Sequence, residues 1–542
     1  MFIIMNQSWL DESPFASLAE DIAALGELFV FNVGFELRWF SAFYDGEKRL
    51  IDVGHMRRSV MGGGPLSLAT QAKRDLKIDM EKEQQLSDWS LPSLSAAQII
   101  YAGMDGVYTR DLGVHWVAEM TPAQWNGFEI LNDAAASFSE MEDTGLELDV
   151  AHHAMLLRMW EMRVAASEAA IRKRVPTKHL QNIRSRKQVS DFIKSILDEA
   201  SIASWPQTPK TKQLQCTRDI LRQMSYRTPY PFSRFLAGLM VYNRAAAYVS
   251  NYGEILANKQ HLEGRIRCRL NVGAAITGRS SASKPNLQSI PKAPLVRKAF
   301  TVRKGRLMVL ADYSSVEVRV LAELSGDAQL LHDAIYDDIH ARSAIAIFKF
   351  NTDAYLLKLA EKDTQAKAAR GKAKGFTFQL LYGAGAAALS LVLRCSIAEA
   401  EDAIQAWAKR YPKAYGYRQI MYEEMKMTGF LTMHSGRTVF VHKNERTMPV
   451  AANYPNQGCA ADVIYRACYH VQRLLDAAGL LDTFMALTVH DEILLDTVPT
   501  EAVRAKQCLE QGMTMGWQDI FPGSNTDNLV DAVIGKTWGD KE

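Results

Sequence analysis

Residues 487–494 read LTVHDEIL, and this short stretch limits the fold and the chemistry more than any other part of the chain. Asp491 and Glu492 lie between the apolar runs FMALTV and ILLD, which both have the length and composition of short strands. The two acids are therefore predicted on the tight turn of a β-hairpin. Carboxylates on a hairpin tip stay within reach of solvent, and they are good oxygen ligands for a divalent metal ion.

A third acid follows another apolar strand about 180 residues earlier in the chain. In LMVLADYSSVEVRVLAELSGD, the run at 307–310 predicts a strand that delivers Asp312 to a strand-to-helix transition. Carboxylates from two strands that converge on a pair of metal ions suit an in-line phosphoryl transfer. Taken singly, Asp312 could instead cap a helix, and Asp491 could be an ordinary turn residue.

The size and composition of the chain are those of a globular protein with several domains. Its 542 residues allow about two to four domains, and no apolar run reaches the roughly 18 residues of a membrane span. The six cysteines include no CxxC pair, which argues against a zinc site and for reduced thiols. The first residues do not resemble a secretion signal. We expect a cytoplasmic protein, in a bacterium or in a phage-infected host cell.

A local basic segment contrasts with the overall net charge of only +2. Residues 172–187 carry seven Lys and Arg side chains and no acid. An isolated run of this kind is more often a solvated helix end. It becomes a candidate contact for a phosphate backbone if the rest of the chain handles nucleic acid. The candidate side chains are Arg172, Lys173, Arg174, Arg184, Arg186 and Lys187.

The residue pattern changes twice along the chain. Residues 1–125 mix short strands with helices; FVFNVGFELRWF predicts a strand that ends in a turn, and AAQIIYAGMDGVYTRDLGVHWV predicts an amphipathic helix. Long helical patterns dominate from about 126 to 260. From about 264 to the end, strands, glycine turns and helices alternate.

Five segments resemble those of the family A DNA polymerases, the DNA polymerase I-like group. DYSSVEVRVLAELSGD, from Asp312, resembles motif A of that family; RGKAKGFTFQLLYG, at 370–383, resembles motif B; and LTVHDEILLD resembles motif C. TGRSSASKPNLQSIP, at 277–291, and NYPNQGCAAD, at 453–462, match two further family segments. The resemblance covers roughly residues 130–542. Five matches in the family's order and spacing make chance a poor explanation.

The resemblance implies a multidomain α+β fold, shaped like a right hand and preceded by an incomplete ribonuclease H-like 3′–5′ exonuclease domain. Residues 126–262 would form a helical thumb, residues 263–330 and 430–542 the palm, and residues 331–429 the fingers. Residues 1–125 would form the exonuclease-like domain.

The resemblance also implies the chemistry of nucleotidyl transfer to a primer 3′ hydroxyl. Asp312 and Asp491 would bridge two Mg²⁺ ions, for which Mn²⁺ can substitute, and Glu492 would lie beside them. Without a cation, acids clustered this closely would repel one another.

A four-residue repeat runs through motif B, at Arg370, Lys374, Phe378 and Tyr382. Each step of four advances by about 40° around a helix, so these side chains form one slowly winding stripe. Arg370 and Lys374 can meet a triphosphate, and Lys374 can also protonate the leaving pyrophosphate. Phe378 and Tyr382 can pack on the sugar and base. The alternative is an exposed cationic turn that runs into a core aromatic stripe.

The family's pattern implies roles for further residues. Glu317 would be a steric gate that leaves no room for a ribose 2′ hydroxyl; a surface helix acid is the alternative. Phe378 would discriminate against dideoxynucleotides, and His340 would contact the incoming phosphates. Contacts with the primer terminus and the template are implied for Arg279, Asn453, Gln457 and His490.

Two positions depart from the family's pattern. Ser315 stands where motif A usually carries Gln, and serine is too short to replace its reach. Pro449 replaces an arginine of the family, for which Arg446 is a candidate substitute.

The first 125 residues resemble the 3′–5′ exonuclease domain that precedes many such polymerases. NVGFE, with Asn32 and Glu36, resembles the second exonuclease motif, and YAGMD, with Tyr101 and Asp105, resembles the third. A turn and an amphipathic helix are the simpler interpretations of these short motifs.

The first exonuclease motif, a strand-borne Asp-x-Glu, is expected upstream of NVGFE. The acidic pair at 11–12 precedes a predicted helix and does not fit it. We therefore expect little proofreading by this chain alone. A shortened start, a strand supplied by a separate polypeptide, and a domain kept as scaffold all remain open.

Together these expectations describe a template-directed DNA polymerase of DNA replication, with primer-template DNA and dNTPs as partners. A processivity factor, or a polypeptide that completes the exonuclease, is an open partner. The rivals are a non-catalytic DNA-binding scaffold derived from a polymerase and an RNA polymerase of similar shape, which Glu317 disfavours. The compact chain without a 5′ nuclease segment favours a phage source.

Overall fold

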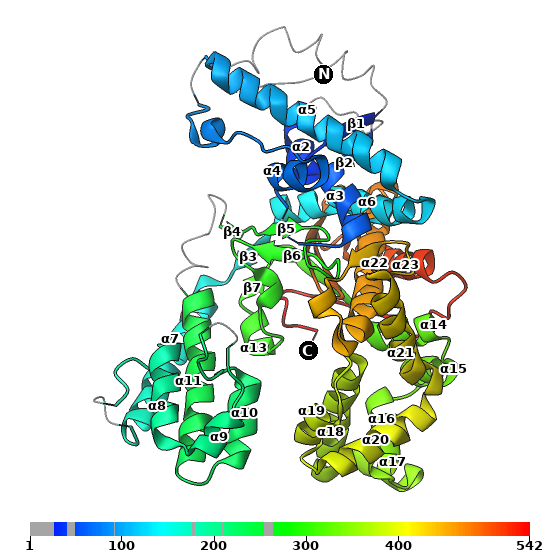
Figure 1. Cartoon of the computed structure of the whole chain (residues 1–542). Helices are drawn as coiled ribbons and strands as arrows, with labels where there is room; N and C mark the ends of the chain where they lie inside the picture. The colour runs from blue at the N-terminus through cyan, green and yellow to red at the C-terminus, as the bar shows by residue number, and fades with distance from the viewer. Residues whose placement is uncertain are drawn as a thin grey trace.

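The computed structural model describes residues 27–40, 49–64, 66–90, 93–175, 179–208, 211–253 and 264–541. Figure 1 shows the N-terminal segment on top of a body that contains the main sheet, with two groups of helices below it. The acidic pair at 11–12 lies outside the described residues. Among the residues that are described, no helix is both long and apolar enough to cross a bilayer.

A four-stranded antiparallel sheet forms the centre of the body. Its strand order is β11-β12-β8-β13, and its register places Asp312 opposite both Glu492 and Asp531. Three of the strands are buried along most of their length, as their nearly continuous apolar runs predict. The strands are β8 (Leu307–Tyr313), β11 (Thr483–Val489), β12 (Glu492–Thr497) and β13 (Val530–Gly535).

The two faces of this sheet have different partners. The hydroxyl of Tyr313 donates a hydrogen bond of 2.6 Å to the carbonyl oxygen of Met513 on α23 (Ala502–Ile520), which covers one face. α23 packs closely along α22 (Met448–Ala477), where a Cβ on Gly516 would lie 2.4 Å from a backbone nitrogen. Because side chains alternate along a strand, Asp312 points to the face opposite α23.

The N-terminal segment contains two parallel strands, β1 (Glu27–Val30) and β2 (Arg49–Asp52). The predicted strand at 29–40 is wrong in its second half, because residues Val33–Phe40 form helix α2. The reason is a contact distant in sequence: the Asp52 carboxylate accepts a 2.8 Å hydrogen bond from Val33 N–H, and it also caps α3. The helix predicted at 96–117 is confirmed as α5. The helical segments here are α3 (Val53–Met61), α4 (Leu68–Gln71), a π turn (Ala72–Leu76), a 3₁₀ turn (Glu83–Leu86) and α5 (Ala96–Glu119).

Helix α6 (Pro122–Thr144) belongs to the core of the sheet, although it begins the region predicted as thumb. Ser137 donates to the carbonyl oxygen of Cys468 on α22, and Glu140 accepts a 3.0 Å hydrogen bond from the backbone of Met485 on β11. β3 (Leu146–Leu148) follows and pairs with β4 (Arg265–Ile266) and β7 (Phe300–Thr301). A helical period alone does not reveal which neighbour a helix packs against.

Two groups of helices have hydrophobic cores of their own. The first comprises α7 (Val150–Arg172), α8 (Arg186–Ile196), α9 (Glu199–Ala203), α10 (Arg218–Arg227) and α11 (Phe232–Tyr252). The second comprises α14 (Val316–Ser325), α15 (Ala328–Tyr336), α16 (Ile339–Phe348), α17 (Thr352–Ala360), α18 (Thr364–Leu381), α19 (Ala386–Leu393), α20 (Ile397–Arg410) and α21 (Pro412–Thr428). The groups touch where Arg394 donates a 2.8 Å hydrogen bond to the hydroxyl of Tyr226.

Short elements connect these parts. β5 (Arg269–Asn271) pairs with β6 (Ser281–Ser283), and β9 (Phe430–Thr432) pairs with β10 (Thr438–Phe440). The remaining helical turns are Leu287–Ser289, α13 (Pro294–Arg297) and Lys443–Glu445.

Candidate active site

The predicted acids from the two strands meet at one edge of the main sheet. His490, with a φ of 59°, and Asp491 form the two-residue loop between β11 and β12, where a left-handed residue is favourable. The carbonyl oxygen of Asp491 accepts a hydrogen bond of 3.2 Å from the backbone of Tyr313. Glu492, the first residue of β12, lies opposite Asp312. The hairpin and the strand-to-helix transition therefore bring Asp312, Asp491 and Glu492 together.

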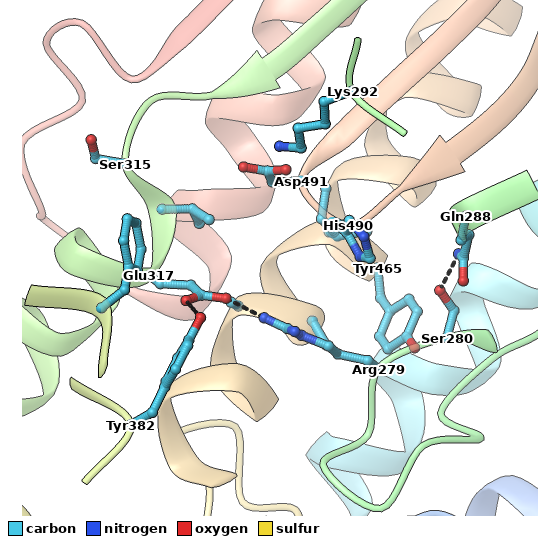
Figure 2. Close-up of a pocket in the computed structure, with 15 residues that line it drawn as sticks. Arg279, Ser280, Gln288, Lys292, Ser315, Glu317, Tyr382, Tyr465, His490 and Asp491 are labelled. Atoms are coloured by element: carbon cyan, nitrogen blue, oxygen red, sulfur yellow. Dashed lines mark hydrogen bonds and ion pairs between the residues drawn. The ribbon is translucent and has the colours of Figure 1, made fainter. Parts of the chain in front are cut away.

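The environment of Asp491 disfavours its ionised form. Burial raises the pKa of the Asp491 carboxyl, Asp312 adds to the rise, and Lys292 opposes it. Figure 2 shows the amine of Lys292 beside this carboxylate. Lys292 comes directly after the segment at 277–291, and no motif marks it. A carboxyl with a raised pKa gains stabilisation of its charged form from a bound cation.

Glu492 is held by two donors inside the protein. Its carboxylate lies 3.1 Å from a guanidinium nitrogen of Arg297 and accepts a 3.0 Å hydrogen bond from the indole of Trp538. Burial still raises the pKa of Glu492 above its ordinary value. The structure thus fixes the orientation of Glu492 beside Asp312, and its role as a metal ligand stays a prediction.

Lys541 is a contact of Asp312 that the sequence did not reveal. Its ammonium lies 2.5 Å from one oxygen of Asp312 and 3.6 Å from a carboxylate oxygen of Asp531. A cation already lies against the acid that is predicted to bind metal. The possible metal ligands at this edge are the carboxylate oxygens of Asp312, Asp491 and Glu492. Mg²⁺ prefers hard oxygen ligands of this type, so the residues present fit a site for divalent metal ions.

Replacing Lys541 by methionine is expected to tighten the binding of Mn²⁺ about fivefold, because a charge repulsion of roughly 1 kcal/mol is removed. Electron paramagnetic resonance titration of free Mn²⁺ measures this without DNA or nucleotide. Lys536→Met, at an exposed position of the same segment, is the matched control. Unchanged or weaker Mn²⁺ binding by Lys541→Met would contradict the expectation.

A cavity of about 260 Å³ opens beside these acids. Figure 2 shows its side chains, which come mainly from the turn at 279–280, the β11–β12 hairpin, helix α22 and two helices of the second group. Of the predicted residues, it is lined by Arg279, Ser315, Glu317, Phe378, Tyr382, His490 and Asp491. Ser280 and Gln288, which belong to the family segment at 277–291, also line it. The sequence did not point to Lys292 and Tyr465, which line it too.

Glu317 joins two of the other predicted residues. It lies in the first turn of α14, forms an ion pair with Arg279 and accepts a hydrogen bond from the hydroxyl of Tyr382 (Figure 2). Burial and the charge of Glu317 both raise the pKa of Tyr382. The phenol therefore stays protonated and donates a hydrogen bond to Glu317. One carboxylate therefore links α14, the end of α18 and the turn that carries Arg279. This geometry excludes the solvated surface acid as the interpretation of Glu317.

The cationic half of the α18 stripe faces His340. Arg370 forms an ion pair with Asp338, and the ring of His340 lies 5.5 Å from that of Phe378. Burial and the charges of Lys374 and Arg370 lower the pKa of His340 to about 4, so the imidazole is neutral near pH 7. Its Nδ1 is buried and has no hydrogen-bond partner among the described residues. Lys374 is exposed, with its ammonium 6.0 Å from the centre of the Phe378 ring.

Asn453 and Gln457 lie on α22, one to three turns before residues of that helix that line the cavity. The structure does not place them on the cavity wall itself. Pro449 occupies the first turn of α22 and meets Gly383 at the end of motif B. Arg446 donates to two backbone carbonyl groups, each at 3.1 Å, so its guanidinium is already engaged.

Two arginines of the basic segment at 172–187 form hydrogen bonds within the protein. Arg172 donates to the carbonyl oxygens of Leu180 and Gln181, and Arg174 donates to that of Ala170 at 2.7 Å. These two arginines stabilise the end of α7, as the solvated-helix-end interpretation expects. The exposed side chains that stay candidates for a phosphate backbone are Lys173, Arg184, Arg186 and Lys187.

Three of the four exonuclease-like residues lie on helices. Asn32, with a φ of 73°, precedes α2, which carries Glu36; Tyr101 and Asp105 lie on α5. Burial and the charge of Asp52 raise the pKa of Glu36 to about 7. Burial also raises the pKa of Asp105. Within the described residues, no hydrogen bond or ion pair connects Glu36 with Asp105.

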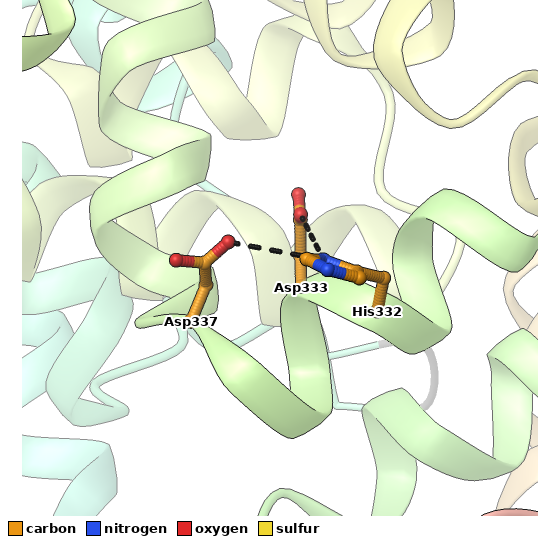
Figure 3. A group of neighbouring side chains, drawn as sticks. All are labelled: His332, Asp333 and Asp337. Atoms are coloured by element: carbon orange, nitrogen blue, oxygen red, sulfur yellow. Dashed lines mark ion pairs between the residues drawn. The ribbon is translucent and has the colours of Figure 1, made fainter.

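A separate group of possible metal ligands, His332, Asp333 and Asp337, lies on α15 and just beyond it (Figure 3). Arg410 donates to Asp333 at 2.8 Å, and Arg342 donates to Asp337 at 2.8 Å. These ion pairs already neutralise both carboxylates. The group is therefore explained as part of the packing of the second helical group.

Comparison with protein families matches residues 152–540 to "DNA polymerase family A". The match covers more than half of the chain. The chain belongs to DNA polymerase family A. The family expected from the five sequence segments is thereby confirmed.

Known proteins agree with this assignment. The thermostable DNA polymerase I of Thermus aquaticus is 30% identical over 432 residues, which are 76% of this chain and 48% of that protein. DNA polymerase I of Mycobacterium tuberculosis is 29% identical over 464 residues, 81% of this chain and 48% of that protein. This family A chain spans about half the length of the curated relatives it matches.

The fold is also that of a solved polymerase domain. The POL domain of Pol1 from M. smegmatis, in complex with DNA primer-template and dNTP, superimposes with a TM-score of 0.80 at 22% identity. The match covers 99% of this chain and 90% of that chain. At this identity the likeness concerns the fold, and it confirms the α+β class predicted from the sequence.

Proposed function

We propose that this chain is a template-directed DNA polymerase that adds deoxynucleotides to the 3′ end of a primer. The observation that carries the proposal is the convergence of Asp312 and Asp491 beside the cavity that Arg279, Glu317 and Tyr382 line. Membership of DNA polymerase family A supports it. A purely structural scaffold would not need Asp491 and Glu492 beside Asp312, because burial disfavours the charged forms of Asp491 and Glu492 without a cation.

Asp312 and Asp491 would hold two Mg²⁺ ions, with Mn²⁺ as a substitute and with Glu492 oriented beside them by Arg297 and Trp538. Such ions would activate the primer hydroxyl and neutralise the leaving pyrophosphate. Arg370 and Lys374 would bind the triphosphate, and Lys374 would give a proton to the leaving group.

The remaining cavity residues would select the nucleotide. Glu317 is fixed by Arg279 and Tyr382, so its carboxylate would exclude a ribose 2′ hydroxyl rather than move aside. Phe378 would pack on the sugar. Neutral His340 would offer a ring N–H to the incoming phosphates.

We assign the main sheet with α6, α22 and α23 to the palm, α7–α11 to the thumb, and α15–α21 to the fingers. The thumb would begin with α7 and not at residue 126, because α6 shares the core of the sheet. The exposed cations Lys173, Arg184, Arg186 and Lys187 would contact the duplex backbone. Closure of α18 on a matching nucleotide would complete the site.

The N-terminal segment would be an exonuclease-like domain, in which Glu36 and Asp105 correspond to metal ligands. The raised pKa values of both acids suit carboxyls that a cation would stabilise. The expected site of action is the cytoplasm of a bacterium or of a phage-infected host cell.

Primer extension with purified protein, Mg²⁺ and either dNTPs or rNTPs tests the proposal. Extension with dNTPs and not with rNTPs is expected. DNA binding without extension would favour the scaffold, and full extension with rNTPs would favour an RNA polymerase.

Phe378→Tyr is expected to raise the incorporation of dideoxynucleotides relative to deoxynucleotides about five- to tenfold, because a new hydroxyl adds about one hydrogen bond of 1 kcal/mol. Chain-termination assays with mixed nucleotides measure the ratio. Phe350→Tyr, at a 38%-exposed ring of the same helical group, is the matched control. Equal ratios before and after Phe378→Tyr would refute the role of this residue.

A further inference from the structure

The turn that carries Arg279 is held from the palm side by one tyrosine. Tyr465 accepts a 2.9 Å hydrogen bond from the backbone of Gly273 and donates one of 2.8 Å to the carbonyl oxygen of Gly278. The turn closes on itself where Ala275 N–H donates to the carbonyl oxygen of Arg279 at 2.9 Å. The conformation of residues 272–279 therefore decides where the Arg279 guanidinium lies.

The N-terminal segment holds the same turn from the opposite side. Arg58 donates a 2.8 Å hydrogen bond to the carbonyl oxygen of Val272, and the backbone of Gly64 donates one of 2.8 Å to that of Ala274. Gly63 lies so close that a Cβ there would be 1.8 Å from the carbonyl oxygen of Ala275. That neighbour is backbone and not a flexible side chain, so the turn would have to move.

The helix that presents this loop is itself anchored. α3 begins at the Asp52 cap, and its last turn is bound through Ser59, which donates to the carbonyl oxygen of Gln124 at 2.5 Å. Thr438, on β10, donates to the carbonyl oxygen of Val60 and accepts a 3.1 Å hydrogen bond from Gln124. The loop after α3 is thus a rigid support and not a loose contact.

We infer that the N-terminal segment positions the nucleotide-selecting residues of the polymerase site. Arg58, Gly63 and Gly64 hold the 272–279 turn so that Arg279 reaches Glu317. This inference rests on the proposed polymerase function, and it gives the segment a role in synthesis that is independent of exonuclease activity. Arg58, Gly63 and Gly64 are positioning residues, because they act through Arg279.

The effect should appear in sugar selectivity. If the turn moves, Glu317 loses its ion pair with Arg279 and is held by Tyr382 alone. Without the ion pair, the Glu317 carboxylate can move aside and leave room for a ribose 2′ hydroxyl. A general loss of folded protein would instead lower dNTP and rNTP incorporation in equal proportion and leave their ratio unchanged.

The test is steady-state extension with dNTPs and rNTPs by full-length Gly63→Ala, with equal melting curves as the check of folding. The ratio of kcat/KM for dNTP over rNTP is expected to fall about tenfold, the equivalent of one charged hydrogen bond. In an Arg279→Ala background, Gly63→Ala should change the ratio no further, because both substitutions act on one contact. Gly103→Ala is the matched control, since a Cβ there on α5 meets nothing within 4 Å.

An unchanged ratio in folded Gly63→Ala would overturn the inference, and so would an equal fall of the ratio in the Arg279→Ala background. If Gly63→Ala does not fold, Arg58→Met replaces it in the test: the ratio should fall in the otherwise unaltered protein and should fall no further in the Arg279→Ala background. Arg58→Lys keeps a donor for the carbonyl oxygen of Val272 and should restore the ratio. Absence of extension by the unaltered protein would instead refute the polymerase function, before any variant is compared.

Discussion

Asp312→Asn is expected to lower the rate of primer extension in Mg²⁺ by about a thousandfold or more, a loss of roughly 4 kcal/mol of transition-state stabilisation. The substitution keeps the shape of the side chain and removes the charge that a metal ion needs. Since β8 is buried and the Asp312 side chain is 39% exposed at its end, the fold should tolerate the amide. Single-turnover extension of a labelled primer measures the chemical step.

The matched control for this prediction is Asp531→Asn. Asp531 lies in the same cross-strand row as Asp312 and also contacts Lys541, yet its strand β13 is separated from the β11–β12 hairpin by β8. A side chain that is 67% exposed on the outer strand should change the rate by no more than a few-fold. Equal losses from both substitutions would mean that the net charge of the row matters, and not a ligand at Asp312.

The sequence predicted the centre of the candidate site because its signals are local. Asp491 follows one apolar run and precedes another, so a hairpin tip could be inferred without knowing its neighbours. Asp312 ends an apolar run in the same way. That the two strands lie in one sheet came from the resemblance to the polymerase family, and the antiparallel pairing of β8 with β12 agrees with it.

Contacts between distant segments are what the sequence did not reveal. Lys541 reaches Asp312 across 229 positions, and Arg297 reaches Glu492 across 195. Arg297 was expected from the sequence to be a structural ion-pair partner, which the ion pair with Glu492 confirms, but its partner could not be named. Lys541 belongs to no periodic pattern, so only the folded chain identifies it. The same holds for Asp52, whose carboxylate starts α2 from 19 residues away and converts a predicted strand into a helix.

Helix α6 shows a different limit of what a sequence pattern can predict. Its helical period was visible, and the helix exists. The period, however, marks an apolar face without naming its partner, and that face packs in the core of the sheet and not among helices α7–α11. Domain boundaries drawn from periodicity are for this reason less secure than the elements themselves.

Lys374→Ala is expected to lower kcat for primer extension about a hundred- to ten-thousandfold, the usual range for removing a general acid. Lys374 is exposed on α18, and its neighbours Arg370 and His340 surround the place where a triphosphate would lie. Lys372→Ala is the matched control. It lies two positions earlier on the same helix, about 200° around the axis, and should leave kcat nearly unchanged.

Lys374→Arg separates the two roles of this lysine. A guanidinium keeps the positive charge that binds phosphate but does not give up a proton near neutral pH. If Lys374 protonates the leaving pyrophosphate, the arginine variant should keep KM for dNTP within a few-fold of the original value and still lose most of kcat. Recovery of kcat by Lys374→Arg would show that the charge alone is needed, and the proton transfer would then have to be assigned to another donor.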